Sequence, residues 1–182
     1  MSNTCPSFGP SHHGPHDQPA WKGRPPHKLL DRLKTERVIA AGISALGDAL
    51  RAAMPGRTLE LVALRVSVLL VNSYIWNGHT YIALDDMLTF EEIARVAAGA
   101  SAFTGRDAMI LRAVEELVCG ARMSDDTRLA LGSQVLSVIV AAGFYRLVAT
   151  IMQDVPPEPG VPAIPGLENP AQAARTYHGR AA

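Results

Sequence analysis

Two ionisable side chains lie in the most apolar part of the chain, and together they suit proton transfer. Glu60 begins the stretch ELVALRVSVLLVNSYIWNGH, which ends at His79. A carboxylate among leucines and valines is costly to bury unless it is paired or protonated. Histidine titrates near neutral pH, and a carboxylate on one ring nitrogen fixes the tautomer that leaves the other nitrogen basic. The pair predicts an acid–base site with Glu60 and His79 as its catalytic residues.

Each of these residues also has an ordinary structural interpretation. Glu60 could form a salt bridge with Arg57, three residues earlier, or with Arg65, five residues later. A single histidine in an apolar segment is more often a core residue than a catalyst. The catalytic hypothesis therefore requires the carboxylate and the imidazole to meet.

Polar and aromatic residues between the two suggest how a substrate could be held. Asn72, Tyr74 and Trp76 carry donors that could hydrogen-bond an oxygen as it gains negative charge. Arg65 is the fourth residue predicted to bind substrate. Ordinary packing is the alternative for the two aromatic residues. Tyr145 could likewise belong to the site or to the core, and the core is favoured.

Chain geometry limits how Glu60 and His79 can meet. In one straight helix they would be about 28 Å apart. The chain must reverse at Asn72-Ser73, or a neighbouring subunit must supply one of them. After a reversal, Glu60 is still about 18 Å before the break and His79 about 10 Å after it. The two helices must then cross at an angle, or water must bridge the remaining gap.

Apolar residues recur at spacings of three and four along most of the chain, which predicts an all-α fold. A buried strand is the rival for residues 58–71, because β-branched residues are frequent there. Thr58, Asn72-Ser73, the Thr89–Glu92 capping box and Ser124 are the expected helix starts. The expected helical segments cover about residues 29–50, 58–71, 73–84, 90–98, 105–120, a stretch after 124, and 135–152.

Composition divides the chain into three parts. Residues 1–25 are rich in Pro, Gly, Ser and His and predict a flexible arm. Residues 26–154 form the predicted helical domain. Residues 155–182 begin with PPEPGVPAIPG, which predicts an extended proline-rich tail over the surface or over a partner subunit.

Charge and hydropathy exclude several function classes. The formal net charge is zero, so the chain lacks the basic surface of a nucleic-acid binder. No apolar run reaches the roughly 18 uninterrupted residues of a membrane span, and the N-terminus lacks a signal-peptide core. We therefore expect a cytoplasmic protein with no membrane and no nucleic-acid partner.

Metal and thiol chemistry find little support. His12, His13 and His16 have no acidic or thiol partner at a ligand spacing, so we predict no metal and no cofactor. Cys5 and Cys119 form no disulfide framework. Cys119 has no base beside it in the sequence, which predicts a buried structural thiol.

Four sequence blocks resemble the carboxymuconolactone decarboxylase family, relatives of alkylhydroperoxidase D. They read R-x-x-E-L-V-A-L-R-V, N-S-Y-x-W-x-x-H, L-T-F-E-E-I-A and G-F-Y-R-L-V-A, and the resemblance covers about residues 28–158. It implies an all-helical, alkylhydroperoxidase D-like subunit that assembles as a homotrimer or homohexamer, often with sites near subunit contacts. It also implies that Glu60 is the proton-relay glutamate and His79 the active-site histidine.

The chain departs from both branches of that family. The peroxidase branch has a C-x-x-C pair where this chain has Asn72 and Ile75, so disulfide-based peroxide reduction is not available there. The decarboxylase branch has N-S-Y-E-W, with a glutamate where Ile75 stands. A candidate acid–base group is therefore missing, while Glu60 and His79 are kept.

These observations favour a cofactor-independent lyase or isomerase that acts on a small lactone or conjugated carbonyl compound. The alternative is a non-catalytic oligomeric binding or scaffold protein that lost its chemistry at position 75. A thiol peroxidase that uses Cys119 and Cys5 is the third and weakest hypothesis.

Overall fold

The computed structural model describes residues 27–85, 87–120, 122–157 and 163–181. Within those ranges the chain is helical with no strand, which confirms the predicted all-α class. The predicted N-terminal arm and Cys5 lie outside the described residues. The helices are α1 (His27–Arg32), α2 (Arg37–Ala53), α3 (Gly56–Leu69), α4 (Ser73–Ala83), α5 (Phe90–Ala98), α6 (Gly105–Cys119), α7 (Asp125–Leu131), α8 (Val135–Ile151) and α9 (Pro170–Ala181), with short 3-10 turns at Ala100–Ala102 and Gly132–Gln134.

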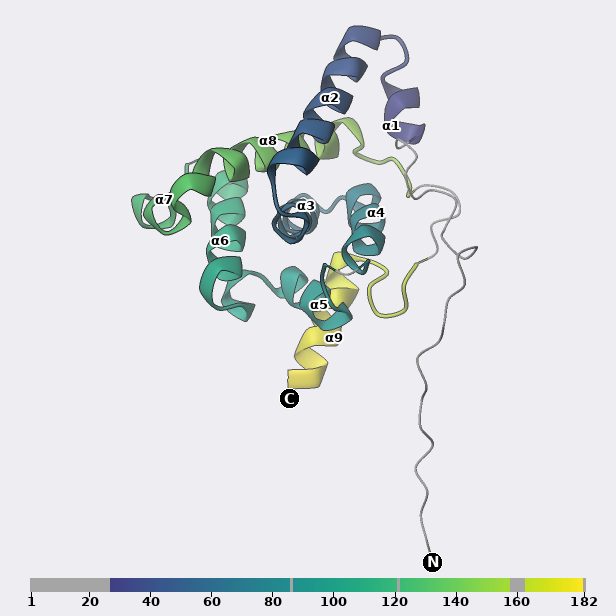
Figure 1. Cartoon of the computed structure of the whole chain (residues 1–182). Helices are drawn as coiled ribbons and strands as arrows, with labels where there is room; N and C mark the ends of the chain where they lie inside the picture. The colour runs from purple at the N-terminus through teal and green to yellow at the C-terminus, as the bar shows by residue number, and fades with distance from the viewer. Residues whose placement is uncertain (1–26, 86, 121, 158–162, 182) are drawn as a thin grey trace, which may run out of the picture.

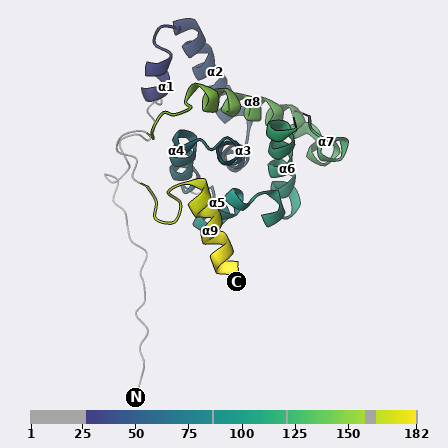
Figure 2. The ribbon, with the colours of Figure 1, turned by 180° about the vertical axis from the view of Figure 1, so that it is seen from behind.

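Helix α3 occupies the centre of the molecule. Every residue from Thr58 to Ser67 is buried, including the charged Glu60 and Arg65. Helices α4, α5, α6 and α8 pack around it, as both views of the ribbon show (Figures 1 and 2). A helix that is apolar on nearly all sides must be enclosed by other elements. The helical prediction for residues 58–71 is therefore right, and the rival strand is wrong.

The chain reverses between α3 and α4, as predicted. Val71 has φ 52°, a left-handed conformation that is strained for a β-branched residue. Asn72 then adopts an extended conformation and caps α4, because its side-chain oxygen accepts a hydrogen bond from Ile75 N at 2.9 Å. Its amide nitrogen donates to Ala149 O of α8 at 3.1 Å. The reversal places α4 beside α3.

One expected helix is divided in the structure, and another starts earlier than expected. The segment expected over 29–50 is divided into α1 and α2 by a turn at residues 33–36. Helix α3 begins at Gly56 with Pro55 at its N-cap, so Thr58 is a buried helical residue and not a cap. The proline restricts its own φ and ends the preceding segment, which outweighs the capping preference of threonine.

The caps of α5 and α7 are confirmed. Thr89 Oγ1 accepts a hydrogen bond from Glu92 N at 3.2 Å, and Thr89 N donates to the Glu92 carboxylate at 2.8 Å. This reciprocal pair is a complete capping box. At α7, Ser124 Oγ accepts from Thr127 N at 3.3 Å.

The prediction of an extended tail from 155 to 182 is wrong for its last part. Residues Pro170–Ala181 form α9, which packs along α5 (Figure 1). Leu167 and Ala173 are buried, and Leu167 O accepts a hydrogen bond from Trp76 Nε1 at 2.8 Å. The last proline, Pro170, is the first residue of α9, where proline is tolerated, and an Ala-rich run with good helix propensity follows it.

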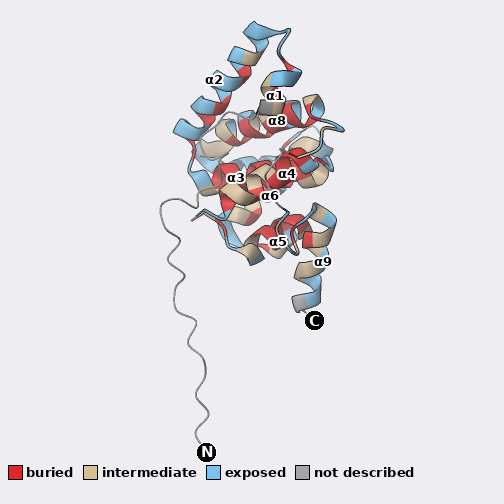
Figure 3. Ribbon diagram, turned by 90° about the vertical axis from the view of Figure 1, so that its right-hand side faces the viewer, coloured by how far each residue is buried: buried red, intermediate tan, exposed pale blue. Residues whose placement is uncertain are grey.

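Helix α8 has two contrasting faces (Figure 3). Its inner face packs against α3 and α6, whereas Leu136, Val140 and Leu147 on its outer face are 72%, 43% and 47% exposed. The continuous helical segment Asp125–Ile151 is long and apolar enough to cross a membrane, and 33% of its most apolar window is buried. One such segment is weak support for membrane insertion, because core helices share this composition.

Candidate functional site

Glu60 and His79 are in direct contact. His79 Nδ1 lies 2.7 Å from Glu60 Oε2, and the side chains are 19% and 5% exposed, respectively. Glu60 projects from the central helix α3, and His79 from the second half of α4. No bridging water is needed, because α3 and α4 lie side by side after the reversal at Val71-Asn72.

This contact determines which nitrogen of His79 is available for chemistry. A carboxylate can only accept hydrogen bonds, so the Glu60 contact assigns the ring proton to Nδ1. Nε2 then carries the free lone pair. Among the described residues it has no hydrogen-bond partner. The arrangement is that of an oriented general base, with its second nitrogen open to a ligand.

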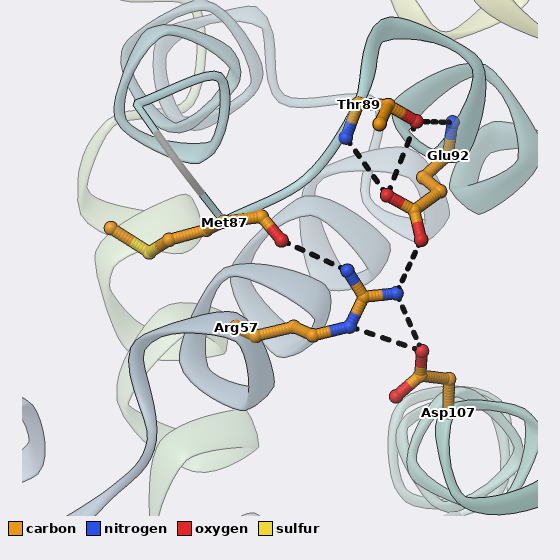
Figure 4. A network of polar contacts seen from close by, with 5 residues as sticks. All are labelled: Arg57, Met87, Thr89, Glu92 and Asp107. Atoms are coloured by element: carbon orange, nitrogen blue, oxygen red, sulfur yellow. Dashed lines mark hydrogen bonds and ion pairs between the residues drawn. The ribbon is translucent and has the colours of Figure 1, made fainter.

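Neither arginine that could have neutralised Glu60 does so. Arg57 Nη2 donates to Glu92 Oε1 at 2.5 Å and to Asp107 Oδ2 at 2.7 Å, and Nη1 donates to Met87 O at 2.9 Å (Figure 4). One guanidinium thus ties the N-terminal turn of α3 to those of α5 and α6. The hydrogen bond from Arg57 lowers the pKa of Glu92 to about 2, and the same contact raises the pKa of Arg57. The predicted salt-bridge alternative is wrong for Arg57.

Arg65 is also committed elsewhere. Its Nη1 donates to Val96 O and Ala97 O in the last turn of α5, where the helix dipole favours a cation. Its Nη2 lies 2.8 Å from Glu115 Oε1 of α6. Burial lowers the pKa of Arg65, and Glu115 partly opposes that shift. Arg65 therefore holds α3, α5 and α6 together and does not pair with Glu60.

Gly99 allows the contact between Arg65 and Glu115. Its φ of +111° is one that side-chain-bearing residues rarely adopt. A Cβ atom built there would lie 3.0 Å from Arg65 Nη2 and 3.2 Å from Glu115 Oε1. A glycine at this place is required both by the backbone and by the ion pair.

Besides Arg65, the structure assigns structural roles to two more residues that were predicted to bind substrate. Trp76 is fully buried, and its only donor is used on Leu167 O. The side chain of Asn72 bonds Ile75 N, Ala149 O and Met152 O, at 2.9, 3.1 and 3.4 Å. Neither side chain has a donor left for a substrate oxygen. Tyr74 is buried at 8% exposure.

Tyr145 was predicted to be a core residue, and the structure places it against the pair. Its ring centroid lies 4.9 Å from that of His79, with the two planes at 89°. The residue is 5% exposed. Burial raises the pKa of Tyr145, the charge on Glu60 raises it further, and Arg51 opposes the shift. Because α8 is distant from α3 and α4 in sequence, local spacing gave no indication of this contact.

Cys119 also differs from its prediction. It is exposed at the end of α6 and forms no disulfide within the described part of the chain, whereas a buried thiol was expected. The last turn of α6 lies at the surface, so its apolar pattern does not ensure burial. Among the described residues, no group of three or more His, Cys, Asp or Glu side chains could hold a metal ion.

Comparison with known proteins gives one match. The family model described as the carboxymuconolactone decarboxylase family matches residues 36–117, from the turn before α2 into the last turns of α6. No curated protein and no solved structure matches the chain. The matched segment contains Glu60 and His79. Tyr145 and the C-terminal segment that holds Trp76 lie outside it.

Proposed function

Because residues 36–117 belong to the carboxymuconolactone decarboxylase family, we propose that this protein is a cofactor-independent lyase or isomerase that acts on a small lactone or conjugated carbonyl compound. The 2.7 Å contact between His79 Nδ1 and Glu60 Oε2 is the observation that carries the proposal. It gives an imidazole with a fixed tautomer and an unpartnered Nε2, in a largely buried setting. Members of the family differ in function, so the proposed reaction type rests on the geometry of the Glu60–His79 pair.

His79 acts first as the base. Nε2 removes a proton from the carbon beside the substrate carbonyl, and the C–H electron pair moves to the carbonyl oxygen to give an enolate. The imidazolium that forms is stabilised by the Glu60 carboxylate, which accepts the hydrogen bond from its Nδ1. Return of the proton to another carbon of the conjugated system completes an isomerisation. If the substrate instead loses carbon dioxide, the C–C electron pair forms the same enolate and an imidazolium donates the proton.

Deuterium exchange tests this step without knowledge of the natural substrate. A panel of small unsaturated lactones is incubated with the protein in heavy water, and proton loss at the carbon beside the carbonyl is followed by NMR. We expect exchange on at least one compound, and a loss of about 100-fold or more for His79→Ala and Glu60→Gln, since acid–base groups contribute 10²–10⁴-fold. The matched controls are His178→Ala and Glu91→Gln, which lie on α9 and α5 away from the pair.

The proposal fails if both site variants exchange every responsive lactone as fast as the wild type. It fails equally if none of the panel exchanges with the wild-type protein. The controls separate a specific effect from general loss of a histidine or glutamate.

We also propose that the chain assembles as a homotrimer or homohexamer. Leu136, Val140 and Leu147 recur at intervals of four and seven on the outer face of α8, and Ile39 and Leu46 of the adjacent α2 are 54% and 38% exposed. Apolar residues exposed at helical spacing favour a helix–helix interface. Light scattering after size exclusion tests this. Val140→Glu with Leu147→Glu should give a monomer, and a wild-type monomer at working concentration contradicts the proposal.

A non-catalytic binding protein is the second candidate, and one residue favours it. Ile75 is 2% exposed and stands where the decarboxylase branch has a glutamate. Its apolar side chain supplies no proton to that part of the site. A lactone that binds in calorimetry but shows neither exchange nor conversion supports this candidate over the enzyme. A cytoplasmic location stays a prediction.

A further inference from the structure

We infer that Tyr145 is a ligand-binding residue of the Glu60–His79 site, where its hydroxyl donates a hydrogen bond to the oxygen that gains negative charge in the substrate. This inference rests on the proposed function, since it names the group that stabilises the negative charge formed on the substrate oxygen when His79 removes the proton. It assigns to α8 a part of the site that lies outside the family-matched segment.

Tyr145 lies directly beside His79. The Tyr145 and His79 rings are in edge-to-face contact, with centroids 4.9 Å apart. A ligand whose reacting carbon, the one beside the carbonyl, lies at His79 Nε2 has its carbonyl oxygen two bonds further away. An aromatic side chain of this length beside the imidazole suits a contact with that oxygen.

The hydroxyl of Tyr145 is available as a hydrogen-bond donor. Tyrosine hydroxyls on buried residues normally have a hydrogen-bond partner. Tyr145 is 5% exposed, its hydroxyl has no partner among the described residues, and it is not one of their fully enclosed unpaired polar atoms, so the oxygen can be reached from solvent. By contrast, the nearby donors of Trp76 and Asn72 are already used on backbone carbonyls. The hydroxyl of Tyr145 is therefore available to a ligand, while those two side chains are not.

The protonation state of the Tyr145 phenol also suits a hydrogen-bond donor. Burial and the charge of Glu60 raise the pKa of Tyr145, and Arg51 opposes this only in part. The phenol thus keeps its proton to a higher pH than an exposed tyrosine does, and a neutral phenol can donate to an oxyanion. A preorganised donor of this kind stabilises the charge that develops in the transition state.

The direct test measures binding of 4-nitrophenol, whose ionised form is a planar delocalised oxyanion with its own visible absorption. The wild-type protein should bind the phenolate form. Tyr145→Phe keeps the ring contact with His79 and removes only the donor, so it should bind the phenolate about 10- to 100-fold more weakly, as expected for a hydrogen bond to a charged group. The matched control is Tyr177→Phe, because Tyr177 also lies beside a histidine ring, at 5.3 Å from His178.

Equal affinity of the wild type and Tyr145→Phe overturns the inference, and so does a wild-type protein that does not bind the phenolate. Folding of the variant is checked by circular dichroism and by an unchanged ¹⁵N spectrum of His79. A Tyr145→Phe protein that exchanges lactone protons as fast as wild type, while His79→Ala does not, removes only this inference. Phenolate binding that depends on Tyr145 without any lactone exchange removes the proposed reaction and keeps the binding role.

Discussion

His79 Nδ1 lies 2.7 Å from Glu60 Oε2, although nineteen residues and a chain reversal separate them. The glutamate is 5% exposed and the histidine 19%, so the pair is sheltered at the carboxylate end and more open at the imidazole end. This asymmetry suits a relay whose inner group orients the outer one. The tautomer of His79 reports whether the carboxylate orients the ring.

The first prediction concerns that tautomer. In the wild-type protein with a neutral His79 ring, ¹⁵N NMR should show Nδ1 protonated and Nε2 unprotonated, because the carboxylate accepts from Nδ1. Glu60→Ala should release the ring to the tautomer with the proton on Nε2. A His79 spectrum that does not change in Glu60→Ala would show that the carboxylate does not orient the ring.

The second prediction concerns acid stability. The folded-state pKa of Glu92 is about 2, below its ordinary 4.5, because Arg57 donates to its carboxylate. A depressed carboxyl pKa stabilises the folded state above pH 4.5, and that contribution is lost as the pH falls towards 2. Since Arg57 is 38% exposed, solvent screening reduces the effect to about 1 kcal/mol.

Urea unfolding at a series of pH values measures this contribution. Glu92→Gln removes the charge that pairs with Arg57 but keeps a residue suited to the capping box. The variant should therefore be less stable than wild type near neutral pH, and the difference should shrink in acid. Glu91→Gln, one residue away and exposed, is the control and should follow the wild-type curve. A constant difference between Glu92→Gln and wild type at all pH values contradicts the prediction.

The third prediction concerns the reversal between the two helices of the site. Val71 has φ 52° and is 84% exposed, so it is strained and buries little surface. Val71→Gly should raise the free energy of unfolding by about 1 kcal/mol, since relief of strain of about 1–3 kcal/mol exceeds the entropy that glycine adds to the unfolded chain. The neighbouring Leu70, with φ −99°, provides the comparison, and Leu70→Gly should destabilise. Destabilisation by both changes would show that Val71 is not strained.

The fourth prediction concerns the segment that closes over α4. Trp76→Phe removes the donor to Leu167 O and leaves a buried carbonyl without a partner, at a cost of about 1–3 kcal/mol. Hydrogen exchange should become faster in α9, which follows Leu167 in the chain, before it does in α3. Unchanged protection of residues 163–181 would mean that the contact of α9 with α5 alone holds this segment.

Local patterns were sufficient for most helices and for several of their ends. The Thr89 capping box, the Ser124 cap and the reversal at Asn72 depend on residues close together in the chain, so composition and spacing predict them. The continuous apolar character of residues 58–71 was enough to predict a central helix. The start of α3 was misplaced because Pro55 competes with Thr58 for the same role.

Partner choice between distant segments could not be read in this way. Spacing along the chain offered Arg57 or Arg65 as an alternative partner of Glu60 beside the hypothesised His79. Both arginines find carboxylates on α5 or α6, and the packing of α4 brings His79 to Glu60. The packing of α8 against α3 places Tyr145 beside the imidazole of His79. The C-terminal segment packs so that Leu167 O accepts the hydrogen bond of Trp76 Nε1. Residue types and helical periodicity specify which groups can do chemistry. Which groups meet depends on how whole helices pack, and that energy comes from contacts made far apart in the chain.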